Sequence, residues 1–398
     1  MTVTTATDTP ESYPQDASQR PIYLDCNATT PMDPRVAAEV AEWMVSEFGN
    51  AGSRTHAYGQ AAKERVARAR REVASVVDAR PEDVSFTSGA TESNNLAILG
   101  LAEYGESVGK RHLICSQIEH KAVLEPFGHL QTRGFEVTTI APSAGGWVDA
   151  NAVAEALRPD TLLVSVMAVN NETGVTQPIE AIASELSESE AFFHVDAAQG
   201  FGKLIDPLLH KRIDLISVSG HKIYGPKGIG ALVMRRRAYK RPPIKPLMFG
   251  GGQERGLRPG TLPVGLIAGL GLASDLALRE HSDRHEHCKN LQHAALRAFM
   301  PLGAVLNGDL ERTVSHTLNI SMPGVDAEAA IVALKEIAAL SNGSACTSQS
   351  YEPSHVLTAA GLPASQISGA LRFSWSYMTR EVEWSQIASR LTALTQTG

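Results

Sequence analysis

The sequence predicts a two-domain α/β protein: a mainly parallel seven-stranded sheet with helices on both faces, and a smaller α/β domain. Seven short β-rich runs alternate with longer amphipathic stretches, the pattern of strands joined by helices. The chain has 398 residues, more than one ordinary domain holds. Its 33 glycines and 21 prolines are spread along the chain, which favours many tight connections. The runs are VSFTSG (84–89), HLICSQ (112–117), FEVTTIA (135–141), LLVSVMA (162–168), FFHVDAA (192–198), DLISVSG (214–220) and GALVMRR (230–236).

The helical segments indicate where the domains divide. Residues 55–77, with AAKERVARARREVASVV, show helical periodicity and a charged outer face. A buried apolar helix is expected at 262–278, followed by a polar helix, REHSDRHEHCKNLQHAALRAFM, and a shorter mixed α/β segment. We therefore place a boundary near residue 276. The expected organisation is a disordered tail over 1–20, a large domain over 35–275, and a small domain formed by 21–34 and 276–398.

Composition excludes several classes of function. A formal net charge of -7 gives no general attraction to nucleic acid or to an anionic membrane, so direct nucleic-acid binding is not expected. The four cysteines lie far apart with no CxxC pair, which argues against a disulfide framework or a zinc site and favours a reducing interior. Residues 1–20 have no apolar core and one basic residue against three acids, unlike a secretory or mitochondrial leader. Residues 262–278 fall short of the roughly 20 clean apolar residues of a membrane span. We expect a cytoplasmic protein without a membrane partner.

Three motifs follow predicted strands, at the sheet edge where open α/β proteins bind ligands. FFHVDAAQG ends a strand on Asp196, and DLISVSGHKIYGPKG ends the next strand beside Lys222. FTSGATESNN is a strand, a turn and a helix start, so its backbone N–H groups and Thr91 suit a phosphate. A strand-end Asp or Lys alone is more often a cap or a surface charge. Together, a phosphate cradle, a lysine and an aspartate meet the requirements of pyridoxal 5'-phosphate (PLP) chemistry.

With these motifs the sequence resembles a known family, the PLP-dependent cysteine desulfurases of the class-V aminotransferase superfamily. The resemblance runs from about Pro21 to the C-terminus. It implies the fold-type-I PLP-dependent transferase architecture, with L-cysteine as substrate and L-alanine as product. The motifs that carry it, in family order, are YLDCNATTP, FTSGATESNN, EHKAVL, VNNETGVTQPI, HVDAAQ, SGHKIYGPKGIG, GGGQERGLRPGT, GSACTS and LRFS.

The resemblance implies roles for three residues around the cofactor ring. Lys222 would hold PLP as a Schiff base and then act as general acid and base, its pKa lowered towards neutrality by desolvation. Asp196 would pair with the pyridinium nitrogen and make the ring an electron sink. His120, in IEHKAV, would stack on the ring face; alone, a histidine after a strand is more often a core or surface residue.

The resemblance also implies the remaining contacts of cofactor and substrate. Gln199 and Asn171 would hydrogen-bond the ring oxygen, while Asn171 and Asn27 would border the substrate. Arg372 in LRFS would clamp the α-carboxylate with its planar guanidinium. Thr261 in RPGT matches a position that reaches the phosphate of the neighbouring subunit, which implies a homodimer with shared active sites. The other implied phosphate ligands are Ala90, Thr91, Ser219 and His221.

Cys346 lies in LSNGSACTSQS, among small, polar and flexible residues. By resemblance its thiolate takes the sulfur of L-cysteine as a persulfide and passes it to an acceptor protein. A Gly- and Ser-containing loop suits a thiol that visits both cofactor and acceptor. The segment alone would favour an idle surface cysteine, but the PLP motifs elsewhere in the chain favour the catalytic role. Asn342 differs from the serine common in relatives, which bears on loop conformation.

The sulfur acceptor is left open by the sequence. Iron–sulfur assembly, transfer-RNA thiolation and DNA backbone modification all use enzymes of this resemblance. In the first case Cys346 could also bind the iron of a cluster held by the partner. Two rival functions use the same fold: GSACTS argues against an aminotransferase, and its small-residue loop argues against a selenocysteine lyase. A third rival is a non-catalytic sulfur-assembly scaffold, and the intact PLP motifs argue against it.

Other features are interpreted as structural. Cys26, although beside the implied site, is interpreted as a small packed residue, and Cys115 as core. His281, His285 and Cys288 share a helix face that could bind a metal weakly, but their charged neighbours indicate a solvated face. The basic stretch 234–246 could dock an acidic protein or RNA, with a solvated loop as the alternative.

Overall fold

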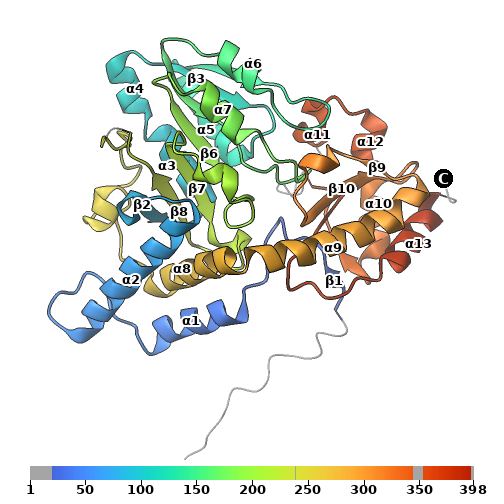
Figure 1. Ribbon diagram of the computed structural model, residues 1–398, viewed down its shortest axis with the longest axis horizontal. Helices are drawn as coiled ribbons and strands as arrows, with labels where there is room; N and C mark the ends of the chain where they lie inside the picture. The colour runs from blue at the N-terminus through green and yellow to red at the C-terminus, as the bar shows by residue number, and fades with distance from the viewer. Residues whose placement is uncertain (1–19, 238, 344–352, 396–398) are drawn as a thin grey trace, which may run out of the picture.

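The computed structural model describes residues 20–395 except 238 and 344–352 (Figure 1). Its largest sheet has seven strands in the order β2-β8-β7-β6-β5-β3-β4. All neighbours are parallel except β8, which is antiparallel to both β7 and β2. Each of the seven predicted runs overlaps one of these strands, so the predicted mainly parallel sheet is confirmed. The strands are β2 (Val84–Thr87), β3 (His112–Ser116), β4 (Glu136–Ile140), β5 (Thr161–Ser165), β6 (Phe192–Asp196), β7 (Leu215–Ser219) and β8 (Gly230–Met234).

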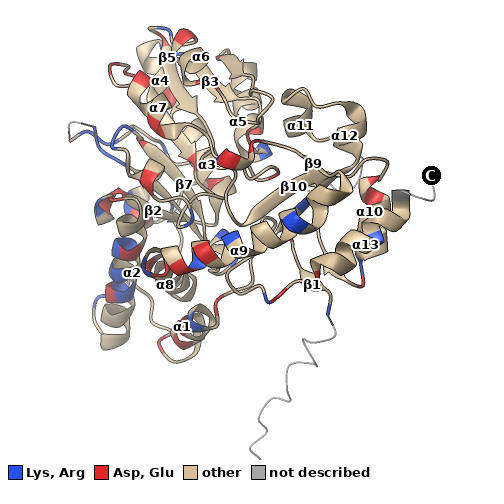
Figure 2. Cartoon of the chain, turned by 45° about the vertical axis from the view of Figure 1, so that its right-hand side comes forward, with Lys and Arg blue, Asp and Glu red and all other residues tan. Residues whose placement is uncertain are grey.

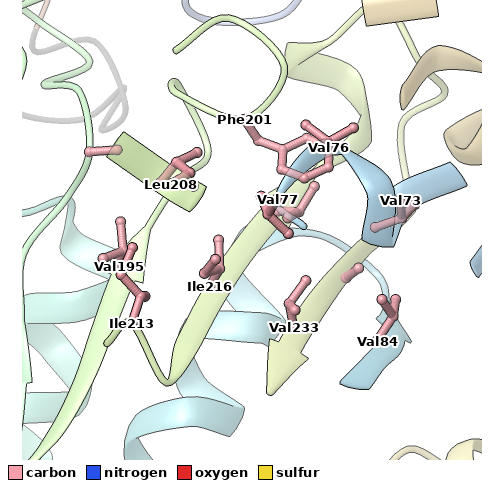
Figure 3. Packing of buried hydrophobic residues seen from close by; sticks show 14 of the residues in the cluster. Val73, Val76, Val77, Val84, Val195, Phe201, Leu208, Ile213, Ile216 and Val233 are labelled. Atoms are coloured by element: carbon pink, nitrogen blue, oxygen red, sulfur yellow. The ribbon is translucent and has the colours of Figure 1, made fainter. Parts of the chain in front are cut away.

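Helices cover both faces of this sheet because successive strand side chains point to opposite faces. In β3, Ile114 belongs to a hydrophobic cluster with α2, α6, α7 and α8, whereas Leu113 and Cys115 belong to one with α3, α4 and α5. Figure 3 shows the first cluster, with Val73 and Val77 packed over Ile216 and Val233. The helices are α1 (Pro34–Val45), α2 (Ala57–Val76), α3 (Ala90–Leu99), α4 (Ala102–Val108), α5 (Lys121–Thr132), α6 (Ala150–Glu155), α7 (Ile179–Glu185) and α8 (Val264–Arg279).

The C-terminal part forms a second core around a small antiparallel sheet of order β12-β10-β9. The N-terminal β1 (Ile22–Tyr23) pairs in parallel with β11 (Ala338–Ala339), so the first strand joins this part. The long helix α9 (His281–Phe299) runs from the large sheet to the small one (Figure 1). The division into 35–275 and 21–34 plus 276–398 stays a prediction, and these separate clusters are its physical basis. The other elements are β9 (Val305–Leu306), β10 (Thr317–Ser321), β12 (Ala370–Ser374), α10 (Ala327–Leu334), α11 (His355–Ala359), α12 (Ala364–Ser368), α13 (Trp384–Thr395) and 3₁₀ turns at Pro81–Asp83, Asp206–Leu209, Gly220–Lys222, Gln253–Gly256, Met300–Leu302 and Leu310–Arg312.

The apolar helix predicted at 262–278 is α8, which packs against α1 and α2. Most of its residues are buried, which accounts for its apolar composition without a lipid environment. Among the helices of the described residues, none combines the length and apolarity that a bilayer crossing needs.

Charged side chains of both signs are interspersed along α2 and α9 (Figure 2). Within the basic stretch 234–246, Arg235 is buried and donates hydrogen bonds to backbone carbonyls, including that of Leu208 at 2.7 Å. Arg237 forms an ion pair with the buried Asp214 at 2.5 Å. These arginines tie loops to the end of the sheet, so the interpretation of the whole stretch as a solvated loop is wrong at Arg235. Their side chains serve the fold because the buried carbonyls and carboxylate need donors.

Candidate active site

A cavity of about 580 Å³ opens at the carboxyl ends of β6 and β7. Asp196 and Ser219 end these two strands, and Lys222 follows in the 3₁₀ turn Gly220–Lys222. Strand β2 delivers the turn before α3 to the same cavity. The structure thus brings together most of the residues singled out from the sequence. Those that line the cavity are Asn27, Ala90, Thr91, His120, Asn171, Asp196, Gln199, Ser219, His221, Lys222 and Arg372.

Asp196 is held in place by α3 and by its own turn. Its side chain is buried, with Oδ2 accepting a hydrogen bond from Asn94 Nδ2 at 2.7 Å and Oδ1 one from the Ala198 N–H at 2.9 Å. Asn94 Oδ1 is buried without a partner. A carboxylate has about four acceptor positions, so Asp196 keeps capacity for a donor in the cavity. Sequence reasoning missed Asn94, whose signal was its place in the strand–turn–helix motif.

The N-terminal segment reaches into the cavity and contacts Lys222. Lys222 Nζ donates to the carbonyls of Asn27 and Ala28, the latter at 2.8 Å. Gln199 Nε2 donates to the same Asn27 carbonyl at 2.9 Å. Asn27 is anchored in turn by Thr317 of β10, at 3.0 Å from its Nδ2. Residues of the large sheet, the N-terminal segment and the small sheet therefore meet at this point.

The turn before α3 presents backbone N–H groups to the cavity. The first intrahelical bond runs from Ser93 N to Gly89 O at 3.1 Å, so the N–H groups of the preceding helical residues lie outside that ladder. Gly89 has a φ of 156°, and a Cβ there would meet no atom within 4 Å. Gly230 of β8 permits this geometry, since a Cβ on it would come within 2.6 Å of Gly89 Cα. The helix dipole favours an anion at this position.

His221 lies beside this turn as a neutral group. Burial, together with Lys222 and Lys227, lowers its pKa to about 4, so the imidazole is uncharged at neutral pH. Its Nδ1 lies 3.1 Å from Thr29 Oγ1. The positive charge of this wall therefore comes from the lysines and the helix terminus, while His221 offers a hydrogen bond.

His120 caps α5, which fixes its tautomer. Its Nδ1 accepts a hydrogen bond from the Ala122 N–H at 3.0 Å, so a neutral ring carries its proton on Nε2. The preceding Glu119 is fully buried, with Oε1 accepting a hydrogen bond from the Met167 N–H at 2.9 Å. Burial raises the pKa of Glu119 to about 8. Sequence reasoning missed this carboxyl, whose signal was an acidic residue shortly after the predicted strand HLICSQ.

Arg372 enters the cavity from β12 and is already part of a network. Its guanidinium donates to Asp25 Oδ1 at 2.6 Å and to the Asn171 carbonyl at 3.0 Å, while Nε is buried without a partner. Two of its five N–H donors are thus used by the chain. The rest suit a carboxylate, as the predicted clamp requires.

Cys346 lies outside the described residues, but both flanks of its segment contact the cavity region. On one side, Ser341 and Gly343 line the cavity. On the other, Ser354 Oγ donates to Glu172 Oε2 at 2.5 Å, where burial raises the pKa of the Glu172 carboxyl. A Cβ on Gly343 would lie 3.4 Å from that same Oε2, so Glu172 lies against both flanks. Sequence reasoning missed Glu172.

Comparison with known proteins identifies the family. The model of the family described as aminotransferase class-V matches residues 22–384. The cysteine desulfurase IscS of Vibrio cholerae is 47% identical over 366 residues, covering 91% of this chain and 90% of that protein. The human cysteine desulfurase is 45% identical over 366 residues, covering 92% of this chain and 79% of that one. The chain belongs to the cysteine desulfurases of the class-V aminotransferase family.

Solved structures of desulfurase-like proteins share the fold. DndA from Streptomyces lividans matches with a TM-score of 0.78 and 50% identity, over 92% of this chain and 99% of that one. SspA in complex with cysteine matches with a TM-score of 0.78 and 39% identity, over 89% and 98%. The resemblance inferred from the motifs is confirmed, as are the fold class, the desulfurase activity and the dependence on PLP.

The cavity of this desulfurase fits PLP. Gln199 Oε1 is buried without a partner, which a hydroxyl-bearing ligand would relieve. Asp196 keeps acceptor capacity for a protonated ring nitrogen, and the α3 terminus offers N–H groups for a phosphate. Lys222 lies in the wall of the same cavity. Thr261 is exposed and does not line the cavity of the single chain, so its predicted role across a dimer stays a prediction.

The other described cysteines are buried in this desulfurase. Cys26 is 1% exposed and outside the cavity lining, and burial raises its pKa to about 12, which leaves it a poor nucleophile at neutral pH. The interpretation of the His281, His285 and Cys288 face as solvated is wrong at Cys288, which is buried where α9 packs on the second core. Among the described residues, no group of three His, Cys, Asp or Glu side chains is placed to hold a metal ion.

Proposed function

We propose that this desulfurase converts L-cysteine to L-alanine in the cavity around Lys222 and passes the sulfur through Cys346 to an acceptor. The proposal rests on the observation that the cofactor and substrate residues and the flank of the Cys346 segment line the same cavity. Lys222, Asp196 and Arg372 line one cavity. Ser341 and Gly343, which precede the Cys346 segment, line it too. A thiol three residues beyond Gly343 is within chain reach of a substrate there.

The proposed roles follow from the chemistry of each side chain. PLP, when bound, supplies an electron sink that stabilises negative charge at the substrate α-carbon and so weakens the bond between the β-carbon and sulfur. Arg372 binds the α-carboxylate and orients the substrate. Lys222 Nζ takes the proton from the α-carbon and later returns one, while Asp196 accepts a hydrogen bond from the ring nitrogen.

The sulfur step assigns a nucleophile to Cys346. Its thiolate forms a sulfur–sulfur bond as the substrate's carbon–sulfur bond breaks, and the electron pair of the broken bond stays with the substrate carbon, which takes up a proton. The products are L-alanine and a persulfide on Cys346. Transfer to an acceptor then regenerates the thiol.

The remaining predicted partners are also proposals. A homodimer with Thr261 reaching the neighbouring cavity is supported by large apolar side chains that the single chain leaves exposed, including Phe249 at 89% and Phe48 at 66%. A cytoplasmic location rests on the separated cysteines. The acceptor stays open among iron–sulfur, transfer-RNA and DNA pathways, and contact of Cys346 with a partner's iron is a proposal for the first.

The proposed reaction is tested by its stoichiometry. Holoenzyme with L-cysteine and a thiol reductant is expected to form alanine and sulfide in equal amounts, measured by amino-acid analysis and sulfide colorimetry. An aminotransferase would instead need a 2-oxo acid and form no sulfide. A scaffold would form neither product, and either of those results would overturn the proposal.

The role of Asp196 predicts the behaviour of Asp196→Asn. The amide is nearly isosteric, and Asn94 can rotate its side chain so that its unpaired Oδ1 accepts from the new amide. The fold and PLP content are therefore expected to persist, while turnover of L-cysteine falls by about 10²-fold or more because the ring nitrogen loses its acidic partner. Steady-state alanine formation and a thermal melt measure the two effects. Wild-type turnover in this variant would remove Asp196 from its role.

A further inference from the structure

We propose that a halide-sized monovalent anion binds in a second cavity, between Lys203 Nζ and His316 Nε2. This cavity is about 30 Å³ in volume and is lined by the first turns of α9. Helix α9 runs from the large sheet to the small one (Figure 1). Its walls include Lys203 and Tyr224 from the large-sheet side, and Arg284, Cys288 and His316 from α9 and the approach to β10. The catalytic cavity shares none of these residues.

Two buried nitrogen atoms in this wall have no hydrogen-bond partner. Lys203 Nζ has none, and its nearest described aromatic contact is the face of Tyr224, 5.9 Å from the ring centroid. His316 Nε2 has none either, and His316 is 5% exposed. A buried polar nitrogen without a hydrogen-bond partner lowers the stability of the folded state, so a bound ligand that accepts hydrogen bonds from both atoms would be stabilising. Both nitrogens can donate a hydrogen bond, and an acceptor placed between them would satisfy both.

The charge of the wall favours an anion over water. No carboxylate is among the described residues that line this cavity. Arg284 is paired with Glu280 at 2.9 Å, but Lys203 has no such partner. Burial lowers the pKa of Lys203 to about 8, which still leaves the ammonium the main form at neutral pH. The thiol of Cys288, with its pKa raised to about 12, is uncharged there and cannot balance it.

The size of the cavity limits the ligand. A space of about 30 Å³ is more than the roughly 10–15 Å³ that one water molecule needs, so the cavity can hold a small monatomic anion. His285 on the rim is exposed, so the cavity is reachable from solvent. Because the walls come from both sides of the junction, the bound anion would link α9 and the residue before β10 to the segment that follows β6.

The first test is thermal unfolding of the holoenzyme at constant ionic strength, with gluconate replaced stepwise by chloride or bromide. We expect a saturable rise in midpoint of about 2 °C at tenfold excess over the dissociation constant. Lys203→Met should abolish the rise. The control Lys211→Met removes an exposed lysine, paired only on the surface with Asp78, and should keep it. An equal rise in Lys203→Met, or none in the wild type, would overturn the proposal.

A second measurement needs no variant, so it decides the matter should Lys203→Met not fold. Crystals of the wild-type holoenzyme soaked in bromide should show an anomalous difference peak within contact distance of both Lys203 Nζ and His316 Nε2. A water molecule there, with no anomalous signal, would mean that the cavity holds solvent and that the anion proposal is wrong.

Discussion

Replacing Lys222 by alanine is expected to lower alanine formation from L-cysteine by about 10⁴-fold or more, because the variant loses the group that moves the α-carbon proton. Lys222 Nζ is fixed by the carbonyls of Asn27 and Ala28 in the wall of the cavity. No other described residue offers an amine with this anchoring. Alanine is measured by amino-acid analysis, and the PLP content by release in acid.

The matched control is Lys63→Ala, which removes an exposed lysine of α2 that does not line the cavity. It should keep wild-type turnover, which shows that loss of one positive charge is not the cause. Full activity in Lys222→Ala would take Lys222 out of the role of base. Loss of PLP content without loss of per-cofactor activity would show that Lys222 only binds the cofactor.

Replacing Cys346 by serine is expected to end sulfide release, by about 10³-fold or more, while PLP stays bound. A hydroxyl is close in size to a thiol but is a much weaker nucleophile at neutral pH and does not carry sulfane sulfur. Sulfide is measured with excess reductant, and PLP content by acid release as above.

Cys26→Ser is the matched control for this thiol. Cys26 is buried, with a pKa raised to about 12 and no place in the cavity lining, so its removal should change turnover by no more than about twofold. Normal sulfide release from Cys346→Ser would contradict the persulfide route. Loss of activity in Cys26→Ser with the fold intact would make Cys26 the sulfur carrier.

The sheet and most of the cavity could be predicted from local pattern. A strand ending on Asp196 and another ending beside Lys222 meet at one edge because both are parallel neighbours in the sheet, as the alternation of β-rich and helical stretches indicates. The turn proposed to bind the phosphate could be predicted because a strand, a glycine and a helix start follow one another in FTSGATESNN.

The partners of these residues could not be predicted because they depend on contacts between distant segments. Glu172 carries no motif of its own, yet it contacts Ser354, 182 residues away. Asn94 supports Asp196 from a helix 102 residues earlier. Arg235 in a basic run looked solvated, but the carbonyls that bury it come from other loops. The spacing of residues along the chain does not show which polar side chains become buried against distant segments.

The central claim is that sulfur leaves L-cysteine by way of Cys346, and a single turnover tests it most directly. Purified holoenzyme is mixed with one equivalent of L-cysteine without reductant, then analysed by intact mass and peptide mapping. We predict one added sulfur on the peptide that contains Cys346, with an equal amount of alanine. Alanine with an unmodified Cys346 peptide would contradict the account and direct attention to another thiol or to direct release of sulfide.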